Sequence, residues 1–361
     1  MTRPTMFDHV SDLFISPDHS IAKVLQVLDR GGVGLVLMVA RDGRLMGTIT
    51  DGDVRRALLR NSQLSERASS IMNRHPVTAR VGTSRNKLAS MMRQRRKRQI
   101  PLLDRDDRVA DIAILDQIFS ITDDPAPART AVIMCGGPGK RLRPLTTSIP
   151  KPMLTVGGQP VLERLIKGLA GNHFRTVFLA VNYHADQIET YFGDGHPWQV
   201  NIQYIREPNY LGTAGALALL PRQLTEPILV VNGDLLTAVK YSNLLEFHLE
   251  RGFDLTVGVK PYRVEVPYGV VGDLQGDQIL ELTEKPAYSF LANLGIYILN
   301  PEVIALVPTS STFDMTELIR KVLDRHGRVG AYPVHEYWID MGELPQYHQA
   351  HLDADNGIFP P

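Results

Sequence analysis

The segment formed by residues 131–154 constrains the fold more than any other part of the chain. It begins with Ala131–Met134, an apolar run with the length and flanks of a buried strand. Residues 136–139 are mostly glycine, so the backbone there is open to a ligand. Cations follow at Lys140, Arg141, Arg143 and Lys151.

Bare backbone amides followed by closely spaced cations suit a polyphosphate. The spacing matches neither the P-loop pattern GxxxxGK[ST] nor the dinucleotide pattern GxGxxG. The residues alone therefore predict a phosphate-binding turn after a strand, or a glycine turn with surface cations.

These residues carry a family resemblance. GGPGKRLRPLT followed by PKPM resembles the signature GGxGTRLxPLT…PKPM of the sugar-1-phosphate nucleotidyltransferases. Pro138 departs from the pattern, and Lys140 stands where the family usually has Thr. The resemblance implies an α/β fold with a Rossmann-like mixed sheet, over residues 130–361.

Composition narrows the function classes. Lys+Arg and Asp+Glu are 39 each in 361 residues, so we expect neither a nucleic-acid partner nor a membrane surface. The first ten residues lack an apolar signal-peptide core, and no apolar run approaches 18 residues. The single cysteine, Cys135, excludes an internal disulfide framework and fits a cytoplasmic location. At a strand end it is expected to be small packing rather than a nucleophile.

Residues 8–122 form a separate unit with an internal repeat of about 60 residues, in which helical and strand patterns alternate. The stretch GTITDGD, residues 47–53, resembles the G-x-x-T-x-x-D motif of CBS domains, so a tandem CBS (α+β) module is expected here. The resemblance implies that Thr50 and Asp53 contact a regulatory nucleotide, with adenine as the possible base. The alternative is a purely structural module that serves as a platform for dimerisation or packing.

The second copy of the repeat has Ala110, Ala113 and Asp116 at the matching offsets, and so lacks the hydroxyl. At most one intact nucleotide site is expected.

Residues 80–103 carry eight basic side chains and no acidic ones. Without interleaved aromatics we interpret this run as a solvated helix end rather than a nucleic-acid patch. Residues 123–129 are expected to be a linker, as part of a proline-containing stretch.

The implied reaction is attack by a sugar 1-phosphate oxygen on the α-phosphorus of a nucleoside triphosphate. A phosphate monoester is already ionised at neutral pH, so the protein must supply charge and positioning rather than a base. By resemblance, Arg141 clamps the triphosphate and Lys151 binds near the α-phosphate. The expected nucleotide-binding residues are Gly136, Gly137, Gly139, Lys140, Arg141, Glu207, Gly212 and Thr213.

Two acids are candidates for Mg²⁺, the one expected cofactor. Asp234 follows a predicted strand, and Asp340 lies in a late W-x-D-x-G segment, as in the family. Mg²⁺ commonly takes one or two carboxylates with phosphate oxygens and water. The other interpretation of Asp234 is a helix N-cap.

The stretch REPNYLGTAG resembles the family segment [QE]-x-x-x-x-G-T, and the resemblance implies that base selection falls to Glu207, five residues before Gly212. A carboxylate matches the two donors on the Watson–Crick edge of guanine, so GTP is expected, with UTP or dTTP as alternatives. Glu207 could instead pair with a neighbouring cation.

Later motifs of the family, YGVV, EKP and NLGIY, place sugar-phosphate contacts at Gly269, Glu284, Lys285 and Asn293. The implied substrate is a hexose or aminohexose 1-phosphate, and a homo-oligomer is expected. Two other classes stay open: a catalytically inactive regulatory subunit, and a redox enzyme, which the missing GxGxxG disfavours.

Overall fold

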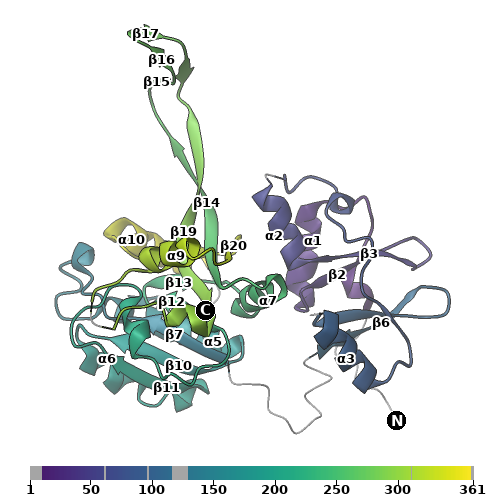
Figure 1. The fold of residues 1–361 in the computed structure, drawn as a ribbon, viewed down its shortest axis with the longest axis horizontal. Helices are drawn as coiled ribbons and strands as arrows, with labels where there is room; N and C mark the ends of the chain where they lie inside the picture. Colours follow the sequence, from purple (N-terminus) through teal and green to yellow (C-terminus); the bar gives the residue numbers. More distant parts are fainter. Residues whose placement is uncertain (1–9, 61, 96, 116–128, 310, 359–361) are drawn as a thin grey trace. The chain divides into compact units, whose positions relative to one another are not determined.

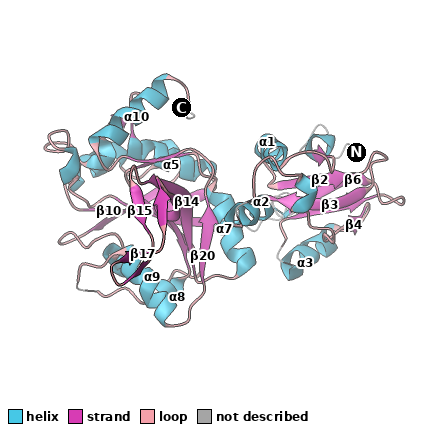
Figure 2. Ribbon diagram, turned by 90° about the horizontal axis from the view of Figure 1, so that it is seen from above, coloured by secondary structure: helices cyan, strands magenta, loops and turns pink. Residues whose placement is uncertain are grey.

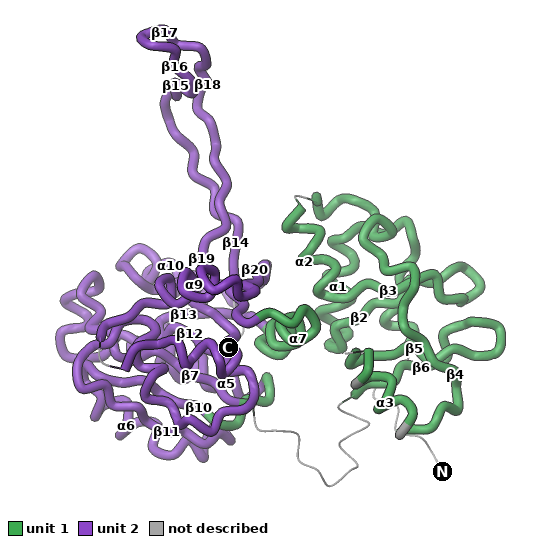
Figure 3. Tube along the Cα trace, in the orientation of Figure 1, with its two compact units in different colours: residues 1–129, 172–176, 240–253 green, residues 130–171, 177–239, 254–361 purple. Residues whose placement is uncertain are grey.

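A computed structural model describes residues 10–358 apart from 61, 96, 116–128 and 310. The chain divides into two compact units (Figure 3). The first consists of residues 1–129, 172–176 and 240–253, and the second holds 130–171, 177–239 and 254–361. Of the predicted linker, only Arg129 lies within the described residues, where it begins strand β7.

The first unit contains two small sheets of the same design, β1–β2–β3 and β4–β5–β6. In each, the first strand is parallel to the second, which is antiparallel to the third. The repeat predicted from the sequence is therefore confirmed in this part of the chain. The elements are η1 (Val10–Leu13), β1 (Phe14–Ile15), α1 (Ile21–Gly31), β2 (Leu35–Val39), β3 (Leu45–Thr50), α2 (Asp51–Leu59), η2 (Ala68–Ser70), β4 (Ala79–Arg80), α3 (Arg85–Arg95), β5 (Gln99–Leu103), β6 (Val109–Ile114) and α7 (Tyr241–Arg251).

Local sequence explains where helix α1 begins and ends. The Ser20 hydroxyl accepts a hydrogen bond from the Lys23 amide at 3.3 Å, which caps the first turn. Gly32 takes the left-handed conformation, with φ of 66°, and terminates the helix. Between these ends, Ile21, Val24 and Leu28 bury one face at helical spacing.

The second unit is built on a seven-stranded sheet in the order β11–β10–β7–β12–β19–β14–β20. β12 is parallel to β7 and antiparallel to β19, so the sheet is mixed, as predicted. The strands are β7 (Arg129–Met134), β10 (Phe174–Val181), β11 (Asn201–Arg206), β12 (Ile228–Asn232), β14 (Leu255–Glu265), β19 (Ala287–Leu299) and β20 (Val329–Pro333). Short strands outside it are β8 (Thr155–Val156), β9 (Gln159–Pro160), β13 (Leu235–Thr237) and β21 (Trp338–Asp340).

Helices cover both faces of this sheet. Figure 2 shows α5 and α10 on one side and α8 and α9 on the other. One core joins the sheet to α9 through Met315, Leu318 and Val322. A second core joins α5, β13, β21 and α10. The helices are η3 (Lys140–Leu142), η4 (Lys151–Met153), α5 (Val161–Gly171), α6 (Ala185–Phe192), η5 (His196–Trp198), η6 (Gly215–Leu219), α8 (Pro301–Ile304), α9 (Met315–Asp324) and α10 (Leu344–Asp355).

The carboxyl ends of β7, β12 and β14 lie at one edge of the sheet, which we call the catalytic edge. β7 is parallel to β12, and both β12 and β14 run antiparallel to β19, so all three point the same way. The glycine-rich loop leaves β7 at this edge, and Asp234 follows β12 there. Ligands of open α/β sheets gather at such an edge.

Two strands of the sheet, β14 and β19, are longer than the others. β14 and β19 continue past the sheet as a two-stranded ribbon, capped by β15 (Gly269–Val271), β16 (Leu274–Gln275), β17 (Gln278–Ile279) and β18 (Leu282–Glu284). We call residues 260–292 the arm; in Figure 1 it stands away from the body of the sheet. Only the first five residues of β14 are buried.

The segment that follows Thr213 forms a 3-10 helix, η6, at Gly215–Leu219. The Phe313 carbonyl accepts hydrogen bonds from the amides of Ala214 and Gly215, both at 3.0 Å. This distant anchor fixes the start of the segment and favours the tighter turn.

Candidate active site

The glycine-rich loop is tied to its surroundings at the catalytic edge. Gly139 has φ of 58°, and its carbonyl accepts a 2.8 Å hydrogen bond from the Thr146 hydroxyl. A Cβ at this position would lie 3.1 Å from the Cβ of Lys151, so the loop passes close to that lysine. The Gly233 amide donates to the Met134 carbonyl at 2.9 Å, which joins the ends of β7 and β12.

Lys151, Asp234 and Asp340 meet at the catalytic edge. Lys151 begins η4 and is 9% exposed, and its Nζ forms an ion pair with Oδ2 of Asp234. The same Nζ lies 3.9 Å from Oδ1 of Asp340. Antiparallel pairing of β13 with β21 brings the two acids together, because the register sets Leu235 opposite Asp340. Asp234 precedes a strand, so it is not a helix N-cap.

Each acid has an oxygen without a hydrogen-bond partner. Oδ1 of Asp234 and Oδ1 of Asp340 are buried and make no hydrogen bond. Burial raises the pKa of Asp340, and the neighbouring charge of Asp234 raises it further. Unpaired buried carboxylate oxygens are costly, and a hard divalent cation would satisfy both. Among the described residues, no group of three or more His, Cys, Asp or Glu side chains is arranged to hold a metal ion. The donor set therefore fits Mg²⁺ bound by two carboxylates together with phosphate oxygens.

Arg141 lies beside this pair of acids and faces solvent. Its Nη1 is 3.1 Å from Oε1 of Glu343, and the arginine side chain is 68% exposed. A Cβ at Gly342 would lie 3.2 Å from its Nη2, so the guanidinium lies against bare backbone next to Asp340. An exposed ion pair of this kind is weak. The guanidinium is therefore available to a phosphate, as is the exposed Lys140.

Glu207 follows β11 and turns back onto the glycine-rich loop. It is 5% exposed, and its Oε2 accepts a 2.8 Å hydrogen bond from the Leu211 amide. A Cβ at Gly136 would lie only 2.3 Å from Oε1, so the carboxylate needs glycine at that position. Burial raises the pKa of Glu207. Within the described part of the chain it has no cationic partner, in contrast to the alternative interpretation drawn from the sequence.

Gly212 and Thr213 lie against the start of α9. The Thr213 amide and hydroxyl both donate to Oδ1 of Asp314, at 2.9 and 3.1 Å, and the hydroxyl accepts from the Met315 amide at 2.9 Å. Gly212 has φ of 82°, and a Cβ there would lie 2.7 Å from the Phe313 carbonyl oxygen. Their predicted nucleotide contact would therefore have to come chiefly from backbone atoms.

Three of the four predicted sugar-phosphate residues lie on the arm, away from the catalytic edge. Gly269 and Glu284 are partners in the β15–β18 pairing, and a Cβ at Gly269 would lie 3.1 Å from Oε2 of Glu284. Lys285 follows with φ of 44°. Asn293 lies at the root of the arm, opposite Val259, where its Oδ1 accepts from the Gly295 amide at 3.0 Å. The structure does not bring the first three to the acids and Lys151.

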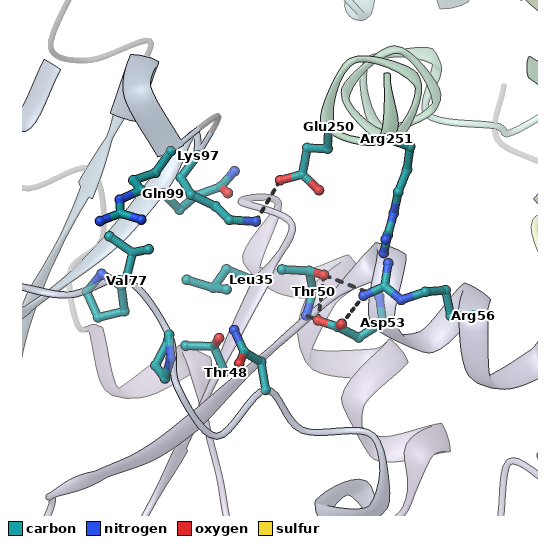
Figure 4. Close-up of a pocket in the computed structure, with 14 residues that line it drawn as sticks. Leu35, Thr48, Thr50, Asp53, Arg56, Val77, Lys97, Gln99, Glu250 and Arg251 are labelled. Atoms are coloured by element: carbon teal, nitrogen blue, oxygen red, sulfur yellow. Dashed lines mark hydrogen bonds and ion pairs between the residues drawn. The ribbon is translucent and has the colours of Figure 1, made fainter. Parts of the chain in front are cut away.

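A cavity of about 440 Å³ lies in the first unit and includes Thr50 and Asp53 (Figure 4). The Thr50 hydroxyl accepts from the Asp53 amide at 3.2 Å, and Oδ2 of Asp53 accepts from the Thr50 amide at 2.8 Å. Asp53 also pairs with Arg56. The predicted regulatory residues are thus brought together, and they form the capping box of α2. The cavity is in the size range of a small-molecule site.

Cations from the basic run 80–103 line this cavity. Arg95 and Lys97 contribute side chains, and Nζ of Lys97 pairs with Oε1 of Glu250 at 3.1 Å (Figure 4). Burial raises the pKa of the nearby Glu246 on α7 to about 7, against the opposing effect of Arg98. Asp116 of the second repeat copy lies outside the described residues.

Cys135 behaves as predicted for a packing residue. It is 1% exposed, and burial raises the pKa of its thiol well above the ordinary value, with the charges of Asp234 and Glu207 acting in the same direction. A neutral, enclosed thiol is a poor nucleophile.

Sequence reasoning missed several residues that shape the site. Thr146 holds the glycine-rich loop, and Asp314 holds Thr213. Asn232 has a buried Oδ1 without a partner, beside Gly295. Asn232 directly precedes Gly233-Asp234, so its position could have been noticed, whereas nothing in the sequence near Asp314 points to Thr213. None of the described helices is long and apolar enough to cross a membrane.

Comparison with known proteins adds family information. Residues 130–357 match the nucleotidyl transferase family, and residues 5–60 and 68–120 match the CBS domain. A UTP–glucose-1-phosphate uridylyltransferase of Synechocystis sp. is 34% identical over 61% of this chain and 62% of its own length. A mannose-1-phosphate guanylyltransferase of Mycobacterium tuberculosis is 32% identical over 64% of this chain and 66% of its own. The chain thus spans less than two thirds of each of these two relatives.

Among solved structures, HddC from Yersinia pseudotuberculosis resembles the chain with a TM-score of 0.50 and 28% identity. The match covers 62% of this chain and 99% of HddC. It supports the fold of the mixed sheet with its flanking helices.

Proposed function

Because the chain belongs to the nucleotidyl transferase family, we propose that it joins a nucleoside triphosphate to a sugar 1-phosphate and releases pyrophosphate. The observation that carries this proposal is the meeting of Lys151 with Asp234 and Asp340 beside the glycine-rich loop. One cation and two acids with unsatisfied oxygens are what a phosphoryl centre needs for positioning and charge.

The reaction forms one bond and breaks one bond. A sugar phosphate oxygen bonds to the α-phosphorus, the bond from that phosphorus to the bridging oxygen of the β-phosphate breaks, and pyrophosphate leaves with the electron pair. The attacking oxygen is already ionised at neutral pH, so no side chain must remove a proton. Lys151 neutralises charge at the α-phosphate, and Arg141 holds the departing pyrophosphate through its fork of donors.

Asp234 and Asp340 are the residues that would hold Mg²⁺, through the two oxygens that lack partners. The ion would neutralise phosphate charge and orient the triphosphate. The Nζ of Lys151, which lies next to both acids, is placed to neutralise the charge of the α-phosphate.

We assign base selection to Glu207 and favour GTP. Oε2 is held by the Leu211 amide, which fixes the carboxylate in the plane that faces Gly136. A buried acceptor pair suits the two N–H donors of guanine, and it would repel the carbonyl oxygens of uracil or thymine. The Mycobacterium relative is named a guanylyltransferase and the Synechocystis relative a uridylyltransferase, so UTP and dTTP are the alternatives.

The sugar is proposed to be a hexose or aminohexose 1-phosphate. Asn293 at the root of the arm, with Gly269, Glu284 and Lys285 farther along it, supplies hydroxyl and phosphate partners.

The cavity with Thr50 and Asp53 is proposed to take an adenine nucleotide, because Arg56, Arg95 and Lys97 surround it with positive charge.

An activity matrix tests the function. The unmodified chain is mixed with Mg²⁺, each of GTP, UTP, dTTP, ATP and CTP, and a panel of hexose and aminohexose 1-phosphates, and released pyrophosphate is measured. We expect the highest kcat/KM with GTP. Turnover with UTP or dTTP alone would overturn the assignment of guanine. Binding of the substrates with no turnover for any pair would identify a catalytically inactive regulatory subunit.

A further inference from the structure

The arm exposes an unusual amount of apolar surface. Of the twenty-four large apolar side chains that are exposed among the described residues, eleven lie between positions 262 and 291. Tyr268 is 73% exposed, Leu282 65% and Tyr262 62%. Eleven such side chains expose roughly 1,000 Å², which is no less than the roughly 800 Å² that one partner buries in a protein interface of standard size.

The arm has no partner within the described part of its own chain. Among the described residues, the hydrogen bonds of its loops and turns, such as that from the Lys285 amide to the Tyr268 carbonyl at 3.2 Å, join arm residues to each other. Its ion pair, Arg263 with Glu265 at 3.7 Å, is also internal. No residue of the arm enters the hydrophobic cores of the second unit. A lone two-stranded ribbon is marginal in water, so this one needs a surface to cover it.

The arm starts at the catalytic edge and carries sugar-phosphate residues away from it. β19 pairs with β12 so that Val231 lies opposite Ile296, which sets the root of the arm beside Asn232. From Gly295, β19 runs back to Ala287, a span of roughly 25 Å at the usual strand rise. Glu284 and Lys285 lie beyond that point. They cannot serve the acids of their own chain in this conformation.

Closure of the arm onto its own catalytic edge would require a bend that the ribbon does not provide. The β14–β19 register runs without interruption from Val259 to Glu265, and its one irregularity lies inside the sheet, between Val257 and Val259. The ladder is interrupted only past Glu265, near the tip. Bending there would leave the tip about 20 Å from the edge.

We infer that the arm is exchanged between two copies of this chain, and that Glu284 and Lys285 of one copy complete the sugar-phosphate site at the catalytic edge of the other. The role of these two residues rests on the proposed function; the exchange itself rests on the exposed ribbon. Each edge lacks the residues that each arm presents. A two-fold dimer satisfies both at once, and swapped elements are a common route to such dimers.

Complementation between two defective variants tests the exchange. Lys151→Ala disables the catalytic edge and leaves the arm intact, while Glu284→Ala/Lys285→Ala does the reverse. Each variant alone should lose at least tenfold in turnover. The two are co-expressed with different tags, and the mixed dimer is isolated by sequential purification. We expect about half the turnover of the unmodified dimer, because one of its two sites is built entirely from intact parts.

A mixed dimer no more active than the two parents would overturn the exchange, since an arm that serves its own chain leaves both sites defective. Full activity of Glu284→Ala/Lys285→Ala alone would remove the arm from the sugar site. If the unmodified chain turns over no substrate pair, the proposed function fails. The exchange is then tested separately, by measuring the association of the chain by sedimentation velocity.

In that measurement, Tyr262→Ser/Leu282→Ser should shift the protein toward monomer. Leu323→Ser changes an exposed leucine on α9, 52% exposed; it is the control and should not shift the protein toward monomer. Unchanged association of the arm variant, or a monomeric unmodified chain, would contradict the exchange. Circular dichroism confirms that the variants are folded.

Discussion

The catalytic edge and the cavity in the first unit both hold carboxylates beside cations, but they differ in what is left unsatisfied. At the edge, Asp234 and Asp340 each keep a buried oxygen without a partner, although Lys151 lies between them. In the cavity, Asp53 is fully used by the Thr50 amide and by Arg56. Binding of a cation would stabilise the first arrangement, because it would satisfy both oxygens. The second must give up existing contacts to bind anything, which favours weak, reversible binding.

The largest expected effect lies at the edge. Asp234→Asn/Asp340→Asn should lower kcat by about 10³-fold or more, because the double variant removes both carboxylate charges that would hold Mg²⁺. Pyrophosphate release measures it, and a thermal shift with Mg²⁺ and nucleotide reports binding separately. Asp186→Asn, an exposed acid on α6, is the control and should keep full turnover. Retained activity in the double variant would refute the metal assignment.

Arg141→Ala should lower kcat by about 10²–10³-fold, because its charge acts mainly on the departing pyrophosphate. Arg141 is exposed and makes only a surface ion pair with Glu343, so stability should change little. Arg222→Ala, an exposed arginine in a turn, serves as the matched control. Unchanged turnover would exclude Arg141 from the mechanism and would weaken the contrast between an open edge and a closed cavity.

In the cavity, Thr50→Val/Asp53→Ala should weaken adenine nucleotide binding about tenfold by calorimetry. The same change removes the cap of α2 and should cost about 1 kcal/mol of unfolding free energy. Thr50→Ser keeps the hydroxyl and should retain both binding and stability. If the unmodified protein binds no adenylate, the module has only a structural role, and Thr50 and Asp53 serve only to cap α2.

The smallest effect is a pH dependence in the first unit. The pKa of Glu246 is raised to about 7 in the folded protein, so its neutral form is favoured there, and its contribution to stability is lost as pH rises from about 4.5 through 7. Glu246→Gln should therefore stabilise the protein by about 1 kcal/mol at pH 8, after allowance for partial exposure, and have little effect at pH 4.5. Urea unfolding at both pH values measures this. A gain independent of pH, or an equal gain in exposed Glu226→Gln, would contradict it.

Local chemistry made much of the fold predictable. The apolar run before the glycines became β7, and the alternating helical and strand patterns of residues 8–122 became two small sheets of the same design with their helices. The mixed sheet of the second unit was expected from the family resemblance of the glycine-rich segment, and the pairing of β12 with β7 and β19 confirms it.

The features that could not be predicted from the sequence depend on contacts between distant parts of the chain. Tyr262 and Val264 alternate with charged residues as in a half-buried strand, yet no second layer covers them in the described chain. The 3-10 form of residues 215–219 depends on the Phe313 carbonyl, a hundred positions away. The unsatisfied oxygens of Asp234 and Asp340 depend on the pairing of β13 with β21, which no short motif encodes.

The contact between Glu207 and the bare backbone of Gly136 has a consequence for how this chain can diverge. Because glutamine has nearly the shape of glutamate, exchange at position 207 would need no repacking of the loop beneath it. The cations and acids that handle phosphate are anchored by other segments. With base selection assigned to Glu207 as proposed, a single substitution there would change nucleotide preference and leave the proposed phosphate-binding residues in place.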